Sequence, residues 1–212
     1  MPISTSGFSI CEQLLLLGLS EHGALDRLHE ARLDYAIAGA SLIDLSFAGR
    51  LDSDPTRLFV IDPEPTGDEL LDDVLDRIAH SEPNQSINHW VSEISGVAHN
   101  VRRERLRHLR ARPVVCEHHG RQQIEFRWGQ DPQVDPVVVG CIREHVMELL
   151  HGDAIPAPED AALVSLARAS GLFDVLMSKK ERKRVEPRVL RLAKLDVIGE
   201  RVNHALDYAL AG

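Results

Sequence analysis

Six arginines crowd one short stretch of the chain, and the chemistry they offer is anion binding. They are Arg102, Arg103, Arg105, Arg107, Arg110 and Arg112, with only Glu104 opposing them. Arginine presents bidentate donors that match the oxygens of a phosphate. The stretch predicts a phosphate- or lipid-facing helix, and the alternative is a solvated helix face. A second basic run at 179–184 is interpreted as a second membrane-facing patch or as a solvated loop or helix start.

The other reactive side chains form no catalytic or metal-binding pattern. The Cys116–His119 segment holds one cysteine and two histidines, but structural zinc takes four ligands and no second pair is nearby. His145 and His151 are six residues apart, so they do not share a helix face. No glycine-rich phosphate loop or Ser–His–Asp signature occurs. We therefore predict a protein that is not an enzyme and uses no metal or cofactor.

Composition limits the classes of partner. The chain has 212 residues, is 43% hydrophobic and carries a net charge of −9, which argues against wholesale binding to nucleic acid or anionic lipid but leaves local patches open. Three cysteines without paired spacing fit a reducing, cytoplasmic location. No apolar run approaches about 18 residues, so we expect no transmembrane segment, and any membrane association would be peripheral and reversible.

Hydrophobic spacing predicts a mainly α fold: a flexible tail over 1–9, then a single helical domain over 10–212. A capping box, Ser9 with Glu12, starts the first helix, and a central helix at 36–48 is built from small and apolar residues. A second capping box, Thr66 with Glu69, starts another helix. The remaining expected elements are a strand at 57–61, helices at 85–95, 102–112, 137–150 and 160–176, one or two helices over 187–210, and a β-hairpin at 114–128.

Four blocks, in order, resemble the Golgi phosphoprotein family, and the chain is similar to its bacterial-type members. The blocks are Glu12-Gln-Leu-Leu-Leu-Leu-Gly-Leu, Ala40-Ser-Leu-Ile-Asp-Leu with Gly49-Arg50-Leu51, Pro65-Thr-Gly-Asp-Glu-Leu-Leu-Asp, and Ala162-Leu-Val-Ser-Leu-Ala-Arg-Ala-Ser. The resemblance implies one mostly helical domain around a central bundle, with a protruding hairpin. It also implies a peripheral membrane adaptor that reads phosphatidylinositol 4-phosphate, and oligomer contacts through the hairpin 114–128.

The family's phosphate pocket can be carried over position by position. Of two helix arginines, the second falls on Arg102 or Arg103, and the first falls on His99 or Asn100. A tryptophan position falls near His29, and a central-helix arginine falls near Ala38. The family's apolar hairpin tip is replaced by His118-His119-Gly120-Arg121, which is polar and becomes more cationic below about pH 6.5.

We therefore predict a non-catalytic protein that binds an anionic lipid or phosphoinositide head group through Arg102 and Arg103, supported by His99 and Arg105. We expect Arg102 and Arg103 to be exposed, so that replacing both reduces vesicle binding without unfolding. The alternative is a nucleic-acid-binding regulator that uses the basic helix 102–112 with the hairpin 114–128 as a wing. The acidic remainder of the chain speaks against that alternative, so we expect no nucleic-acid partner.

Overall fold

A computed structural model describes residues 7–18, 27–54, 57–83, 85–111, 114–118, 122–126, 136–196, 198–202 and 204–205, and within them the chain is mainly helical. The helices are α1 (Ile10–Gly18), α2 (Arg27–Phe47), α3 (Glu69–Ala79), α4 (Ile87–Ser95), α5 (Ala98–Ala111), α6 (Pro136–His151), α7 (Pro158–Ala169), α8 (Leu172–Leu176) and α9 (Lys179–Ala193). The strands are β1 (Leu51–Ser53), β2 (Leu58–Val60), β3 (Val114–His118) and β4 (Gln122–Phe126). The predicted fold class is confirmed.

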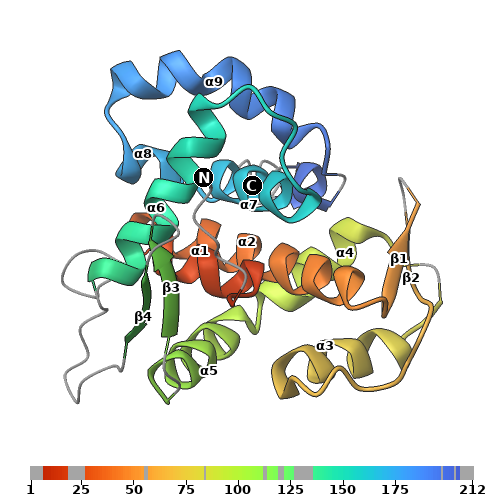
Figure 1. Ribbon diagram of the computed structural model, residues 1–212. Coiled ribbons are helices and arrows are strands. Elements are labelled where there is room, and N and C mark those ends of the chain that lie inside the picture. Colours follow the sequence, from red (N-terminus) through yellow and green to blue (C-terminus); the bar gives the residue numbers. More distant parts are fainter. Residues whose placement is uncertain are drawn as a thin grey trace.

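The first two helices form the centre of the molecule. In Figure 1, α1 and α2 lie in the middle, with α3 and α5 below them and α6, α7 and α9 above. Every residue from Ile10 to Leu17 is buried, including Glu12, because α2, α5, α6 and α7 all pack against α1. One hydrophobic cluster runs from Ile10 to Ala205 and so joins both halves of the chain.

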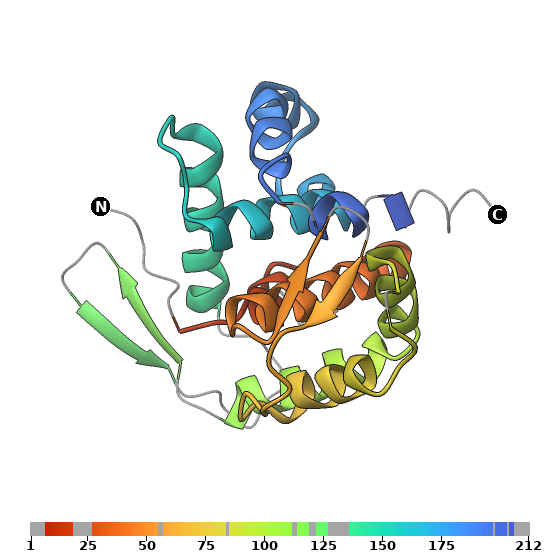
Figure 2. The same cartoon turned by 90° about the vertical axis from the view of Figure 1, so that its right-hand side faces the viewer.

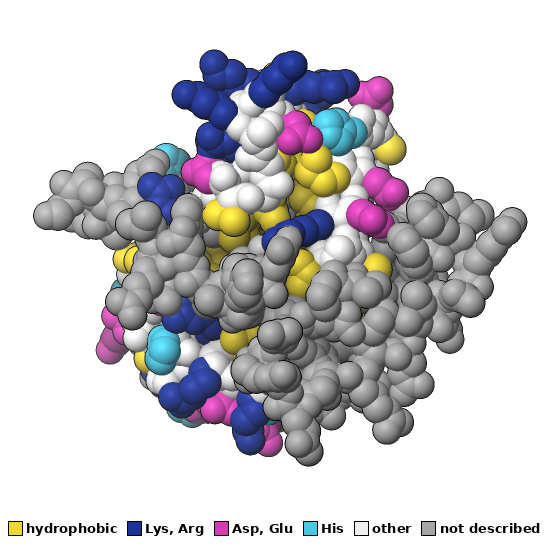
Figure 3. Space-filling view, turned by 90° about the vertical axis from the view of Figure 1, so that its left-hand side faces the viewer, with side chains coloured by type: hydrophobic (Ala, Val, Ile, Leu, Met, Phe, Trp, Pro, Cys, Tyr) yellow, Lys and Arg dark blue, Asp and Glu magenta, His cyan; other side chains and the backbone are white. Residues whose placement is uncertain are grey.

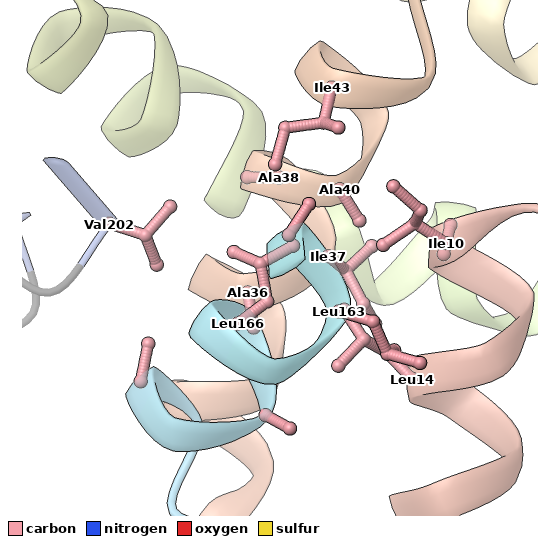
Figure 4. Packing of buried hydrophobic residues seen from close by; sticks show 14 of the residues in the cluster. Ile10, Leu14, Ala36, Ile37, Ala38, Ala40, Ile43, Leu163, Leu166 and Val202 are labelled. Carbon is pink, nitrogen blue, oxygen red and sulfur yellow. The ribbon is translucent and has the colours of Figure 1, made fainter. Parts of the chain in front are cut away.

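Small residues let α2 approach its neighbours closely. Ala36, Ala38 and Ala40 are fully buried, and Figure 4 shows their side chains among those of α1 and α7. A Cβ at Gly39 would meet the side chains of Val202 and Leu166, so only glycine fits this crossing. The predicted central small-residue helix is therefore confirmed.

Side-chain caps fix the start of α1. The Ser9 amide donates to Glu12 Oε2 at 3.0 Å, and the Glu12 amide donates to Ser9 Oγ at 3.2 Å, so the predicted capping box is present. Asp44 of α2 accepts from the amides of Ile10 and Cys11 at 3.0 and 3.2 Å. Burial raises the pKa of Asp44 to about 6, and those two hydrogen bonds oppose the rise. Of the predicted tail, residues 1–6 lie outside the described residues, and Phe8 packs against the core.

The start of α3 differs from the sequence prediction. Asp68, not Thr66, is the N-cap, and its Oδ1 accepts from the amides of Leu70 and Leu71 at 3.0 and 3.2 Å. Gly67 has a φ of 87°, a left-handed turn that separates Thr66 from the helix. Thr66 instead donates its amide and hydroxyl to Asp72 Oδ1. The capping box predicted at Thr66 is therefore wrong.

Two helix boundaries in the C-terminal half also differ. The helix expected over 160–176 is broken at Gly171, where φ is 75°, into α7 and α8. The helix expected to begin at Pro187 begins at Lys179, because Ser178 and Glu181 form a capping box. Pro187 lies inside α9 and is exposed.

Both hairpins are antiparallel. Strand β2 confirms the strand predicted at 57–61 and pairs with β1, Leu51 opposite Val60. Strands β3 and β4 confirm the hairpin predicted near 114–128, with Val114 opposite Phe126 and His118 opposite Gln122. Figure 2 shows this hairpin projecting beyond the helices. The predicted polar tip at 119–121 and Trp128 lie outside the described residues.

Candidate anion-binding surfaces

Arg102 lies in the interior of the protein. Its side chain is 8% exposed, and its Nη1 lies 3.0 Å from Asp34 Oδ1 of α2. Its Nη2 lies 3.1 Å from Nδ1 of His99, one turn earlier on α5. The expectation that Arg102 is exposed is therefore wrong, because its charge serves to join α5 to α2.

Arg105 is buried in the same way. Its side chain is 4% exposed and its Nη1 forms an ion pair with Asp68, the N-cap of α3. A charge this deeply buried needs a partner, because desolvation penalises an unpaired ion by several kcal/mol. Arg105 therefore fastens α3 to α5 and does not face solvent.

A sequence signal for this burial exists. The buried residues of α5 are Ala98, Val101, Arg102, Arg105 and Leu109, which recur at the spacing of one helix face. Both arginines lie on the apolar stripe of the helix. The number of basic residues in this stretch therefore overstates the positive charge that α5 presents to solvent.

Helix α5 presents only a small positive charge to solvent. The side chain of Arg103 is 65% exposed and lies 3.6 Å from Glu104, and Arg107 Nε lies 2.7 Å from the same carboxylate. His99 is also exposed. The side chain of Arg110 and the whole of Arg112 lie outside what the structure describes. Of the four predicted site residues, only Arg103 and His99 face solvent.

The family pocket carried over by resemblance is not assembled in the described residues. Ala38 is fully buried in the core, and the side chain of His29 is outside the described part of the chain. The guanidinium of Arg102 is already engaged by Asp34. The alternative of a nucleic-acid-binding α5 is weakened in the same way, because Arg102 and Arg105 are buried and cannot contact a nucleic acid.

A stronger basic surface lies on α9. Its first two turns expose Lys179, Lys180, Lys183 and Arg184, which we call the α9 basic face. None of the four forms a hydrogen bond or ion pair within the described residues. Figure 3 shows Lys and Arg side chains gathered over the top of the molecule, where α9 lies. The run at 179–184 is thus a helix start, one of the two structures the sequence allowed.

Two cavities open among the described residues. One, of about 340 Å³, lies between α8 and α9 and the side chains of Arg32 and Arg168. The other, of about 390 Å³, lies beside β2 and Trp90, and Glu82 is the only ionisable residue that lines it. Only the first has the charge to attract an anion.

Within the described residues, no group of three or more His, Cys, Asp and Glu side chains could hold a metal ion. His145, which the sequence gave no role, is buried with its Nε2 2.7 Å from Asp160 Oδ1. This contact joins α6 to α7 and lines neither cavity. No helix among the described residues is long and apolar enough to span a membrane.

These features define a mainly helical protein with a buried central helix pair and a locally basic surface. A family model described as "Golgi phosphoprotein 3 (GPP34)" matches residues 10–209, and the chain belongs to this family. Family members are Golgi-associated proteins that are generally not enzymes.

Two curated relatives are both named vacuolar protein sorting-associated protein 74. The one from Eremothecium gossypii is 34% identical over 104 residues, which are 43% of this chain and 31% of the relative. The one from Schizosaccharomyces pombe is 22% identical over 219 aligned positions, 89% of this chain and 65% of the relative. The matches thus cover less than two thirds of either relative's length.

Proposed function

We propose that the protein is a non-catalytic peripheral membrane protein that binds anionic lipid head groups. The observation that carries the proposal is the α9 basic face. Residues three or four apart are neighbours on a helix surface, so Lys179 with Lys183 and Lys180 with Arg184 form two adjacent rows. Each basic side chain near an anionic leaflet contributes about 1 kcal/mol of attraction.

Helix stability does not account for the two cations of the first turn, Lys179 and Lys180. The N-terminal end of a helix carries a partial positive charge, so basic residues there are unfavourable. Glu181 offsets some of this as part of the capping box. Lys179 and Lys180 therefore gain nothing from the helix dipole, which supports an external anion as their partner.

The surface fits general attraction better than selection of one head group. The predicted phosphate-binding arginines Arg102 and Arg105 are held by Asp34 and Asp68 inside the protein. We therefore propose binding to anionic bilayers generally, with Arg103 and His99 of α5 as the other solvent-facing part of the predicted site. Homo-oligomerisation through the hairpin 114–128 stays a prediction.

Vesicle co-sedimentation tests the proposal. Replacing Lys180 and Arg184 with Gln should weaken binding to phosphatidylserine vesicles about 30-fold, because two charges amount to about 2 kcal/mol. Arg103→Gln with Arg107→Gln removes the same charge from α5 and compares the contribution of that helix with the contribution of α9. A larger loss in the α5 variant would place the contact on α5. Absence of salt-sensitive binding to phosphatidylserine or phosphatidylinositol 4-phosphate vesicles would refute lipid binding.

A further inference from the structure

The cavity of about 340 Å³ beside α9 combines cationic and apolar walls. Its cationic residues come from three helices: Arg32 from α2, Arg168 from α7, and Lys179, Arg182 and Lys183 from α9. Its apolar residues are Phe173, Met177, Val185 and Val189, all of them buried. The volume lies at the lower end of the range for small-molecule sites, about 300 to 1,000 Å³.

The cavity carries an excess of positive charge. Five cationic side chains face two acidic ones, Asp174 and Glu186. Arg182 forms an ion pair with Asp174, which cancels one of each sign. Glu186 alone therefore opposes Arg32, Arg168, Lys179 and Lys183. In a chain with a net charge of −9, this is a concentrated local reversal of sign.

The cationic side chains are free to bind. The side chains of Arg32, Arg168, Lys179 and Lys183 form no hydrogen bond or ion pair within the described residues. These four cations are therefore available to an anionic ligand that enters the cavity.

We propose that this cavity binds an amphipathic phosphate ester, with the phosphate at Arg32 and Arg168 and its apolar substituent on the wall formed by Phe173, Met177, Val185 and Val189. Guanidinium groups match phosphate oxygens bidentately, and the apolar wall gains from covering hydrocarbon. The ligand can come from a bilayer phospholipid or from a soluble ester. The inference rests on the proposed function for the bilayer source, because Lys179 and Lys183 belong to both the cavity and the α9 basic face.

The first test is calorimetric titration of the whole chain with monomeric dihexanoyl phosphatidic acid, and with inorganic phosphate alone. Saturable binding of the ester, much tighter than that of inorganic phosphate, is expected. Arg32→Gln with Arg168→Gln should weaken it by roughly tenfold or more, because each substitution removes a charged hydrogen-bond donor. Arg77→Gln with Arg107→Gln, which removes two exposed charges outside both the cavity lining and the α9 basic face, should leave it within about twofold.

Three outcomes would overturn the inference: no saturable binding, equal affinity for inorganic phosphate, or binding unaffected by Arg32→Gln with Arg168→Gln. Thermal unfolding of each variant verifies that it is folded. Co-sedimentation with anionic vesicles, run on the same variants, separates the two proposals. Ester binding without vesicle binding keeps the cavity and removes the peripheral membrane role. Vesicle binding without ester binding keeps the peripheral membrane role and refutes ligand binding in the cavity.

Discussion

The ion pair between Arg105 and Asp68 should stabilise the fold, and removing one partner should cost more than removing the other. Asp68→Asn keeps a side chain that can cap α3 but removes the charge opposite Arg105. Arg105 is only 4% exposed, so its charge would stay buried and lose its ion-pair partner, keeping only the weaker influence of Glu12 and Asp44. Arg105→Met removes the buried charge instead and leaves Asp68, which is 32% exposed and can be hydrated.

The two single changes should therefore differ in cost. Breaking a buried pair costs about 3–5 kcal/mol, and partial exposure of Asp68 places Asp68→Asn at the lower end, about 3 kcal/mol. Arg105→Met should cost about 1–2 kcal/mol, because methionine packs well in interiors but the buried Glu12 loses a nearby positive charge. The double variant should be close to Arg105→Met alone, which gives a coupling energy of about 2–3 kcal/mol.

Urea denaturation of the four proteins measures this cycle, with fluorescence and circular dichroism as two probes of unfolding. Arg107→Met is the control, because Arg107 is 71% exposed and should change stability by less than about 0.5 kcal/mol. Additive costs, with coupling below about 0.5 kcal/mol, would refute the reasoning. The structural role of Arg105 would then have no support, and a lipid-binding role for it would return.

Other regions of the molecule give three further predictions. Burial raises the pKa of Asp44 to about 6, so between about pH 4 and 6 the folded state holds a proton that the unfolded state releases. The free energy of unfolding should therefore fall by up to about 3 kcal/mol as the pH rises through that range. Urea titrations at several pH values should show this loss in the unmodified protein and not in Asp44→Asn. Gly39→Ala should destabilise the protein by about 1–3 kcal/mol because its Cβ would meet Val202 and Leu166, whereas Gly140→Ala, with no atom within 4 Å, should raise the thermal midpoint. Cys11 and Cys141 are buried, and burial raises the pKa of Cys11 to about 12, so in a Cys116→Ser background both thiols should resist alkylation until urea unfolds the chain; fast labelling without urea would contradict their burial.

Local patterns predicted the elements well because their causes are local. The Ser9–Glu12 capping box and the small residues of α2 act within a turn or within one helix face. The errors arose where a single residue overrides the pattern. Gly67 moves the α3 cap to Asp68, and Pro187 is tolerated inside α9.

The site was harder to predict because its partners are distant in sequence. Asp68 precedes Arg105 by 37 residues, and Asp34, which pairs with Arg102, lies on α2, even earlier in the chain. The local sequence around the arginines therefore does not show that their charges are neutralised. The cavity beside α9 draws Arg32 and Arg168 from separate helices. Six clustered arginines predicted an anion site, which stays a prediction, and burial decides which of those arginines reach solvent.

The enclosure of α1 has a consequence for synthesis. Its run of leucines leaves the ribosome early, whereas α6 and α7, which cover it, follow more than a hundred residues later. At about 5–20 residues per second, that delay is roughly 8–30 s, during which one of the most apolar helices has incomplete cover. We therefore expect the leucine side chains of the nascent chain to be exposed until α6 and α7 have been made. Chains stalled before α7 should be cleaved by protease within α1, and completed chains should not.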